Sequence, residues 1–314
     1  MTFAELTPEM IFDATETLGG RCTGRFLQLN AMENRVYDVE MESGERRVIK
    51  FYRPGRWKKE QIQAEHHYLK MALENEVPVV PPLNNPDGQT IGEAHGLFFA
   101  VFPKKPGRLE AELNPEQLKR LGRYLGRLHL VGESLQGQDR PTLNPDYYAR
   151  RSIKVLKELD LVPMGLSQKV TMLVDQIADV LDPRFEKLDN ILVHGDCHAG
   201  NVLWTGDAPH FIDFDDMLYA PAIQDFWMLM GGNDDYAKKN LEIIISGYEE
   251  FREFDDDSLK LIEPLRTLRM IYFMAWIGQR WEDGAFKHAF PYFTSERYWQ
   301  QQVEDLSHQL ALLQ

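Results

Sequence analysis

Cysteines and long apolar segments are scarce in this sequence. Only two cysteines, Cys22 and Cys197, occur in 314 residues, so we expect no disulfide framework and a cytoplasmic protein. The longest apolar segment, residues 270–278, has about half of the roughly 18 residues that a membrane-spanning helix needs. The opening MTFAELTPEM is acidic, whereas a secretory signal is basic. We therefore expect neither a membrane span nor export.

Basic residues are too few to balance the acidic ones. There are 35 Lys and Arg residues against 49 Asp and Glu residues, a formal net charge of −14. Because nucleic acids and anionic membranes are bound by basic faces, we expect neither as a partner. With 43% hydrophobic and 27% charged residues, the chain is typical of a globular protein. Its length suggests about two lobes, and we expect a monomer.

Common nucleotide and zinc motifs are also missing. The sequence has neither a Walker A motif nor G-x-G-x-x-G, so neither a P-loop nor a Rossmann phosphate site is supported. Zinc is an alternative for His194, Cys197 and His198, but no C-x-x-C pair or H-E-x-x-H helix completes a site. Cys197 as a nucleophile is a further alternative, although nothing nearby marks its thiolate as activated.

The first third of the chain alternates short apolar runs with polar loops. The runs predict strands at residues 25–30, 35–41, 46–52 and 97–102. Thr7 before Pro8 is typical of a helix start, and apolar residues at helical spacing predict a helix over 58–76. Glu65 lies on the apolar face of that helix. This part is predicted to be a small antiparallel β lobe with one main helix.

A change of composition at residues 104–115 indicates a linker to a second lobe. Beyond it the pattern is mostly helical, and Gly122 and Gly126 are predicted to permit close helix packing. A β-like island interrupts the helices, at residues 191–195, 201–205 and 210–215. The predicted fold is α+β with two lobes, residues 1–103 and 104–314, on either side of a cleft.

Acidic and amide side chains follow the strands of this island. Asp196 and Asn201 are five residues apart on one loop, and Asp213 ends the next apolar run. In-line phosphoryl transfer needs a carboxylate that orients the acceptor hydroxyl and oxygen ligands for Mg²⁺. The spacing is that of a protein-kinase catalytic loop, although Asp215 stands where the D-F-G motif has glycine. The alternative is that these side chains only cap loops.

The predicted β lobe contributes candidates for nucleotide binding. Lys50 on a predicted strand and Glu65 each need a partner if buried, and together they resemble the pair that positions ATP phosphates in kinases. The alternative is two amphipathic surface residues. The loop that contains Asn30 and Ala31 could present backbone N–H groups to phosphate, or it is an ordinary hairpin turn. The backbone at Phe102 could hold adenine, or belong to a buried edge strand.

Six segments together resemble one family. They are NRVYDVE, VIKFYRPGRW, FFAVFP, GRYLGRLH, HGDCHAGNVLW and PAIQDFWML. In combination they are similar to the bacterial stress response kinase A family, serine/threonine protein kinases with the fold of aminoglycoside phosphotransferases and choline kinases. The resemblance implies a bilobal protein-kinase-like fold, with a nucleotide-binding lobe at residues 1–103 and a catalytic and acceptor-binding lobe at residues 104–314.

The resemblance also implies ATP and Mg²⁺ as cofactors. The implied roles are catalytic base for Asp196, metal ligand for Asn201 and Asp213, and phosphate positioning for Lys50 and Glu65. A serine often stands at the position of Ala31 in this family, so a hydroxyl contact to phosphate is absent here. Asp225, in PAIQDFWML, is predicted to begin or cap a helix in a supporting role.

Three functions follow from these patterns. The leading hypothesis is an ATP- and Mg²⁺-dependent serine/threonine protein kinase of the stress response, with a protein as substrate. A small-molecule kinase is the alternative, because the same catalytic residues serve both kinds of acceptor. An amino alcohol, sugar or aminoglycoside could then meet an acidic aromatic group, formed by Trp276, Trp281, Glu282 and Asp283, unless these residues are core. A nucleotide-binding pseudokinase is the third.

Overall fold

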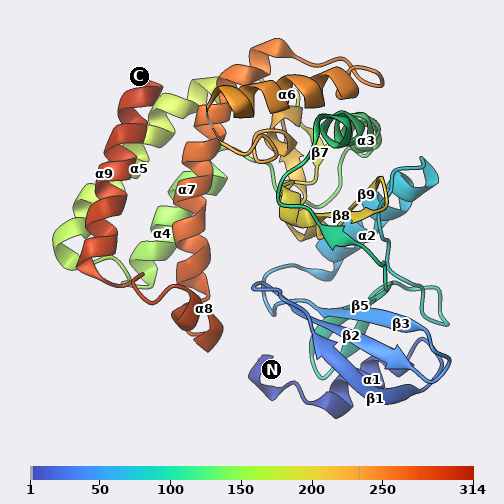
Figure 1. The fold of residues 1–314 in the computed structure, drawn as a ribbon. Coiled ribbons are helices and arrows are strands. Elements are labelled where there is room, and N and C mark those ends of the chain that lie inside the picture. Colours follow the sequence, from blue (N-terminus) through green and yellow to red (C-terminus); the bar gives the residue numbers. More distant parts are fainter. Residues whose placement is uncertain (1–2, 233) are drawn as a thin grey trace. The chain divides into compact units, whose positions relative to one another are not determined.

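The computed structural model describes residues 3–232 and 234–314, and the chain divides into two compact units (Figure 1). The first unit comprises residues 1–140, 192–217 and 228–254, and the second comprises residues 141–191, 218–227 and 255–314. The division of function after residue 103 stays a prediction.

The first unit holds a five-stranded antiparallel sheet with strand order β1-β2-β3-β5-β4. Its strands are β1 (Cys22–Gln28), β2 (Arg35–Met41), β3 (Arg46–Phe51), β4 (Gly92–Ala94) and β5 (Leu97–Pro103). The four predicted strands are confirmed. The sequence did not predict β4, because three residues are too few to show an alternating pattern.

The first unit also contains four α-helices and a second small sheet. Its other elements are α1 (Pro8–Glu16), α2 (Lys59–Glu74), α3 (Pro115–Ser134), α6 (Asp235–Tyr248), β6 (Arg108–Leu109), β7 (Ile191–Val193), β8 (Val202–Thr205) and β9 (Ala208–Phe211). Strands β6, β8 and β9 form an antiparallel sheet in that order. The predicted β island is confirmed, and the predicted linker contains the short strand β6.

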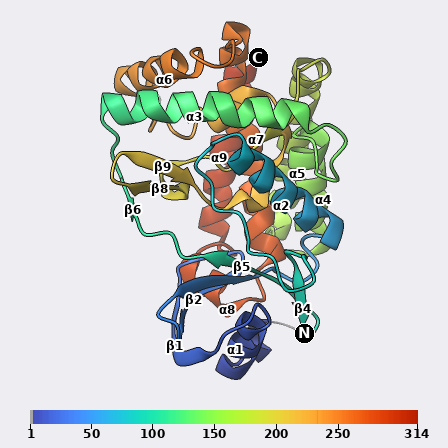
Figure 2. The ribbon, with the colours of Figure 1, turned by 90° about the vertical axis from the view of Figure 1, so that its right-hand side faces the viewer.

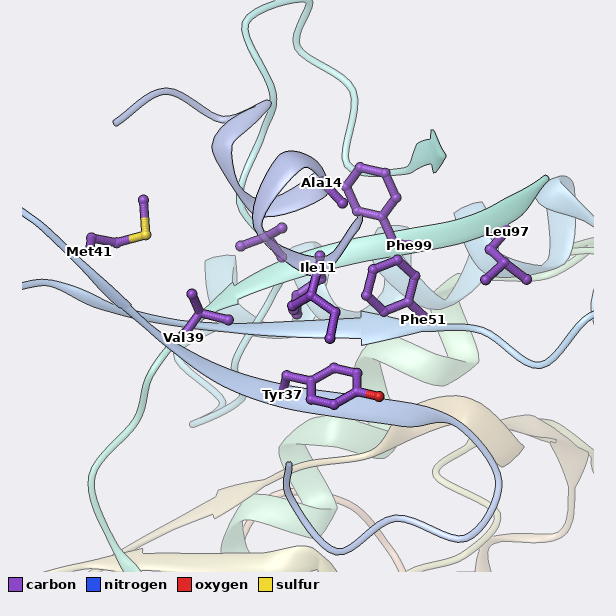
Figure 3. Packing of buried hydrophobic residues seen from close by; sticks show 10 residues of the cluster. Ile11, Ala14, Tyr37, Val39, Met41, Phe51, Leu97 and Phe99 are labelled. Atoms are coloured by element: carbon purple, nitrogen blue, oxygen red, sulfur yellow. The ribbon is translucent and has the colours of Figure 1, made fainter. Parts of the chain in front are cut away.

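Side chains of β3 alternate between the two faces of the larger sheet. Ile49 and Phe51 belong to a buried cluster that Ile11 of α1 joins on one face (Figure 3). Lys50 stands between them in the sequence and therefore points to the opposite face. Its partner in the β3–β5 register, Ala100, packs there with Ile62 of α2. Strand alternation alone thus directs the Lys50 side chain toward α2.

Helices α3 and α6 pack closely along each other (Figure 2). A Cβ atom on Gly122 would lie 2.0 Å from the carbonyl oxygen of Ile244, and one on Gly247 would lie 2.0 Å from that of Lys119. A Cβ atom on Gly126 would also approach a backbone oxygen, at 2.8 Å. The predicted close packing at Gly122 and Gly126 is confirmed. The two helices could not lie this close together if a larger residue replaced either glycine.

The second unit is mainly helical. Its elements are a π-helical turn (Asp146–Arg150), α4 (Arg151–Glu158), α5 (Met164–Phe185), β10 (Leu218–Ala220), α7 (Ile262–Gln279), α8 (Gly284–Ala289) and α9 (Glu296–Leu313), with short 3₁₀ turns. Helix α4 packs on α7, and α5 packs on α9. The rings of Tyr148 and Tyr272 stack with their centroids 4.4 Å apart. No helix among the described residues is both long and apolar enough to cross a bilayer.

Replacing Gly247 by alanine tests the α3–α6 contact. We expect Gly247→Ala to lower the free energy of unfolding by about 1–3 kcal/mol, because the new methyl group overlaps the Lys119 carbonyl. Gly165→Ala in α5 is the matched control, since its Cβ atom would meet open space and alanine favours helix by up to about 1 kcal/mol. Urea unfolding measures both, and equal effects would contradict the close contact.

Candidate active site

The loops that follow β7 and β9 meet in the first unit. The backbone carbonyl of Asn201 accepts a hydrogen bond from the amide of Ile212 (3.0 Å). The side-chain amide of Asn201 donates to the backbone oxygen of Asp196 (3.0 Å) and to its Oδ2 (3.3 Å). Asp213 follows Ile212 directly. The structure thus brings Asp196, Asn201 and Asp213 together at one site.

Two histidines support the loop that carries Asp196. His194 is fully buried, donates from Nε2 to the Ile212 carbonyl (2.9 Å) and accepts the Asp196 amide at Nδ1 (3.3 Å). His198 accepts the Gly200 amide at Nδ1 (3.0 Å) and its Nε2 lies 3.5 Å from Asp196 Oδ2. In the part of the chain that the structure describes, no three His, Cys, Asp or Glu side chains are grouped to hold a metal. The zinc alternative therefore finds no ligand set there.

The backbone at Asp213 is in a rarely used conformation. Its φ of 62° and ψ of 65° lie in the left-handed region, which costs a residue other than glycine about 1–3 kcal/mol. The turn leaves the Asp213 side chain 53% exposed at the end of a buried strand. A strained residue held by its surroundings is typical of a functional position.

Lys50 is the cation at the centre of the site, and its side chain is 8% exposed. Its Nζ lies 3.2 Å from Asp213 Oδ1, 3.2 Å from Asp215 Oδ1 and 3.5 Å from Glu65 Oε1. Burial alone would lower the pKa of Lys50, but the carboxylates of Asp215, Glu65 and Asp213 raise it well above its usual value. Lys50 is therefore charged at neutral pH. The predicted contact between Lys50 and Glu65 is present.

Glu65 shares this one ammonium group with two other carboxylates. It is 2% exposed, and its Oε2 is buried without a hydrogen-bond partner. Burial raises the pKa of Glu65 to about 7, against the attraction of Lys50 and with the added repulsion of Asp215. The site therefore holds more negative charge than Lys50 can neutralise alone.

Asp215 is a member of the site that the sequence did not assign. Its Oδ2 accepts a hydrogen bond from Arg56 Nη1 (2.6 Å), and its backbone oxygen accepts one from Arg140 Nη2 (2.5 Å). Burial alone would raise the pKa of Asp215, but Lys50, Arg56 and Arg140 hold it below its usual range. The available signal was an acidic residue in a buried run, where the D-F-G motif has glycine.

Arg140 ties the end of this loop to α2. Its guanidinium donates from Nε to the Met217 carbonyl (2.8 Å) and from Nη1 to the Gln61 carbonyl (3.2 Å). It also lies over the ring of Trp57, 4.1 Å from the ring centroid. Arg140 is 6% exposed, so these contacts are made away from water. Neither Arg56 nor Arg140 was predicted to belong to the site.

The other nucleotide-binding candidates lie in the same unit. Asn30 is exposed and Ala31 is partly exposed in the connection between β1 and β2, so that loop remains a candidate for phosphate. Phe102 is a partly buried residue of β5 that pairs with Val48, and its ring centroid is 6.3 Å from that of His66. Its backbone role toward adenine stays a prediction.

Several remaining candidates have structural partners in the second unit. Asp225 is fully buried in a 3₁₀ turn, Ala222–Asp225, rather than at the start of an α-helix. Asp283 caps α8 by accepting the Ala285 amide (3.1 Å), and Glu282 pairs with Lys287. The ring of Trp276 packs on Phe286, and that of Trp281 packs on Phe293. These contacts favour the packing interpretation of the acidic aromatic group.

Cys197 lies in the first unit and is fully buried. A thiol without exposed surface cannot meet a substrate, so the structure gives no support to Cys197 as a nucleophile.

His66 is a buried neutral histidine beside Glu65. Its Nε2 lies 2.8 Å from the Tyr52 hydroxyl, and its Nδ1 lies 2.7 Å from Thr90 Oγ1. Burial, with a smaller contribution from the charge of Lys50, lowers the pKa of His66 to about 3. The side chain therefore stays uncharged at neutral pH, and its two hydrogen bonds connect α2 to the residue after β3 and to the segment before β4.

Known proteins similar to this chain are phosphotransferases and kinases. The sequence model of the phosphotransferase enzyme family matches residues 26–262. A stress response kinase A of Escherichia coli O157:H7 is 41% identical over 314 residues, which cover 100% of this chain and 95% of that protein. A serine/threonine protein kinase RdoA of Salmonella typhimurium (strain LT2) is 40% identical over 313 residues, with 99% and 95% covered.

Solved structures of kinases share the fold. An amicoumacin kinase in complex with AMP-PNP, Ca²⁺ and Ami has a TM-score of 0.76 at 20% identity, covering 96% of this chain and 94% of that one. A microcompartment-associated aminopropanol kinase has a TM-score of 0.70 at 18% identity, covering 98% and 96%. The predicted fold is thus confirmed: an aminoglycoside phosphotransferase-type kinase fold with an antiparallel sheet and a helical lobe.

The depressed pKa of His66 makes stability depend on pH. Below about pH 6.5 the unfolded chain takes up a proton at this histidine that the folded chain does not. Each pH unit of acidification therefore lowers the free energy of unfolding by up to about 1.4 kcal/mol. We expect the unfolding free energies of wild type and His66→Gln to converge as pH falls from 7.5 to 5. His67→Gln, at an exposed neighbour, should keep the wild-type dependence. Parallel curves for wild type and His66→Gln would contradict a neutral His66.

Proposed function

The chain belongs to the phosphotransferase enzyme family and, within it, to the stress response kinase A group, and we propose that it phosphorylates serine or threonine hydroxyls of a protein with ATP. The observation that carries this proposal is the meeting of Asp196, Asn201 and Asp213 with the buried Lys50. Phosphoryl transfer needs little covalent help from the protein. It needs groups that position the reactants and neutralise charge.

We assign the acceptor hydroxyl to Asp196. Its carboxylate is partly exposed and is oriented by the Asn201 amide at 3.3 Å and by His198 at 3.5 Å. A carboxylate held in this way can accept the proton of a hydroxyl that docks against it.

We assign the metal to Asn201 and Asp213. The side-chain nitrogen of Asn201 is engaged with Asp196, which leaves its amide oxygen as the donor for a cation. The carboxylate of Asp213 is half-exposed. Two hard oxygen donors suit Mg²⁺, which takes few protein ligands and completes its shell with phosphate and water. When bound there, Mg²⁺ would neutralise charge on the phosphates of ATP.

We assign the phosphates of the nucleotide to Lys50. Its ammonium is already directed at Asp213 and Asp215, and Glu65 holds its other side. A phosphate that approaches Asp213 would therefore find the charged ammonium of Lys50 already positioned to donate a hydrogen bond. The loop that contains Asn30 and Ala31 would contribute backbone N–H groups, and the β5 backbone at Phe102 would face adenine.

The choice of a protein acceptor is supported by the relatives that this chain matches over 95% of their length. One of them is named a serine/threonine protein kinase, at 40% identity. The structural neighbours named for amicoumacin and aminopropanol are at most 20% identical, and they keep a small-molecule acceptor as the second candidate. A cytoplasmic location, where ATP is supplied, suits the two free thiols of Cys22 and Cys197.

Transfer of labelled phosphate tests this function. With ATP and Mg²⁺, we expect label on serine or threonine of a protein acceptor, and Asp196→Asn should lower the rate by about two to four orders of magnitude. Asp207→Asn is the matched control, because that side chain is 92% exposed in the β8–β9 turn, and it should act as wild type.

The other outcomes separate the alternatives. Label confined to an aminoglycoside, choline or aminopropanol would replace the protein acceptor by a small molecule. Bound ATP without any transfer would show a pseudokinase. Full activity of Asp196→Asn would refute its role as the base.

A further inference from the structure

Arg56 stands at a turn between β3 and α2, outside the catalytic segments. The backbone amide of Arg56 donates to the Arg53 carbonyl (3.3 Å), and Gly55 has a φ of 76°. Proline at the second position and a glycine with positive φ at the third are typical of a type II turn. The turn therefore holds Arg53 and Arg56 a fixed distance apart on one short connection.

The Arg56 guanidinium meets three carboxylates from two other segments. Its Nη1 lies 3.1 Å from Glu33 Oε2, in the connection between β1 and β2, and 2.6 Å from Asp215 Oδ2. Its Nη2 pairs with Asp216 Oδ1. The Arg56 side chain is only 7% exposed, so solvent screens these pairs weakly. The Arg56 side chain thus joins its own turn to Asp215, which lies 159 positions further along the sequence.

We propose that Arg56 is a positioning residue that ties the loop of Glu33 to the loop of Asp213, which rests on the proposed roles of these loops in nucleotide and metal binding. Asp213 precedes Asp215 by two residues, so the anchor of Asp215 also sets where the Asp213 carboxylate lies. Glu33 follows Ala31 by two residues in the candidate phosphate loop. Arg56 thus holds the phosphate-facing loop and the metal-facing loop in register.

The forked shape of the guanidinium is what permits this double contact. Its nitrogens can engage carboxylates in two directions at once, whereas the ammonium of lysine is a single point of charge. Removing the guanidinium would take away the cation that the neighbouring carboxylates of Asp215 and Asp216 share. We therefore expect the loop after β9 to loosen without Arg56, even when the rest of the unit stays folded.

Arg53 supplies a matched comparison on the same turn. It donates from Nε to the Glu33 carbonyl (2.8 Å) and from Nη2 to the Met32 carbonyl (3.2 Å), and it pairs with Glu33 Oε1 at 3.1 Å. Arg53 thus supports the loop of Glu33 through contacts with Met32 and Glu33. Its replacement should loosen this loop and leave the loop of Asp213 in place.

Amide hydrogen exchange of the full-length, nucleotide-free protein tests the coupling. The reporters are two hydrogen-bonded amides at the bases of the loops, Leu29 to the Val36 carbonyl (2.8 Å) and Met217 to the Phe214 carbonyl (3.0 Å). In Arg56→Gln both should exchange at least about tenfold faster. In Arg53→Gln we expect faster exchange at Leu29, with Met217 within about twofold of wild type.

The remaining outcomes decide the proposal. The coupling would be overturned if Arg56→Gln accelerated exchange at only one of the two amides. It would also be overturned if Arg53→Gln accelerated exchange at both equally. Should Arg56→Gln not fold, Arg56→Lys keeps the charge and should give the same two-loop pattern, and wild-type exchange in Arg56→Lys would equally overturn it.

The exchange measurement needs neither nucleotide nor activity. A wild-type protein without kinase activity would end the proposed function, while the exchange of Leu29 and Met217 would still decide whether Arg56 couples the two loops.

Discussion

The buried ammonium of Lys50 is the charge on which the site depends. Three carboxylates approach it within 3.5 Å, from α2 and from the loop after β9. A carboxylate buried without a counter-ion is strongly disfavoured, so each of these segments is held where Lys50 can reach it. Strand alternation fixes the direction of the Lys50 side chain. The opposite face of the sheet is filled by the buried cluster that includes Ile11 of α1, so Lys50 could not point there. The core of the sheet therefore determines where the loop after β9 lies.

Arginines complete the neutralisation in a protein that is acidic as a whole. The formal net charge is −14, yet Arg56 and Arg140 converge with Lys50 on Asp215. The buried guanidinium of Arg140 also donates to three backbone carbonyls, so the charges that balance Asp215 also fix the position of the chain around it. A kinase site must bind polyanionic phosphates close to its own carboxylates. An internal cation network of this kind permits both, because the cations are in place before the nucleotide arrives.

Local patterns in the sequence predicted much of this fold, because they reflect local physics. The strands, the main helix of the β lobe, the close packing at Gly122 and Gly126, and the Lys50–Glu65 contact all follow from periodicity or from the need of a buried charge for a partner. Contacts between residues far apart in the sequence leave no periodic pattern, so they could not be predicted. Asp215 meets Arg56 across 159 residues and Arg140 across 75, and the left-handed backbone of Asp213 has no signature in an apolar strand.

The central claim is that Lys50 serves as the counter-ion of the buried carboxylates. A double-mutant cycle on the free energy of unfolding at neutral pH tests it most directly. Lys50→Met should lower the free energy of unfolding by about 3–5 kcal/mol, since it removes the ammonium that Glu65 faces at 3.5 Å. Adding Glu65→Gln to Lys50→Met should then restore part of that stability. Costs that simply add, with Glu65→Gln no more favourable beside Lys50→Met than in wild type, would contradict the account.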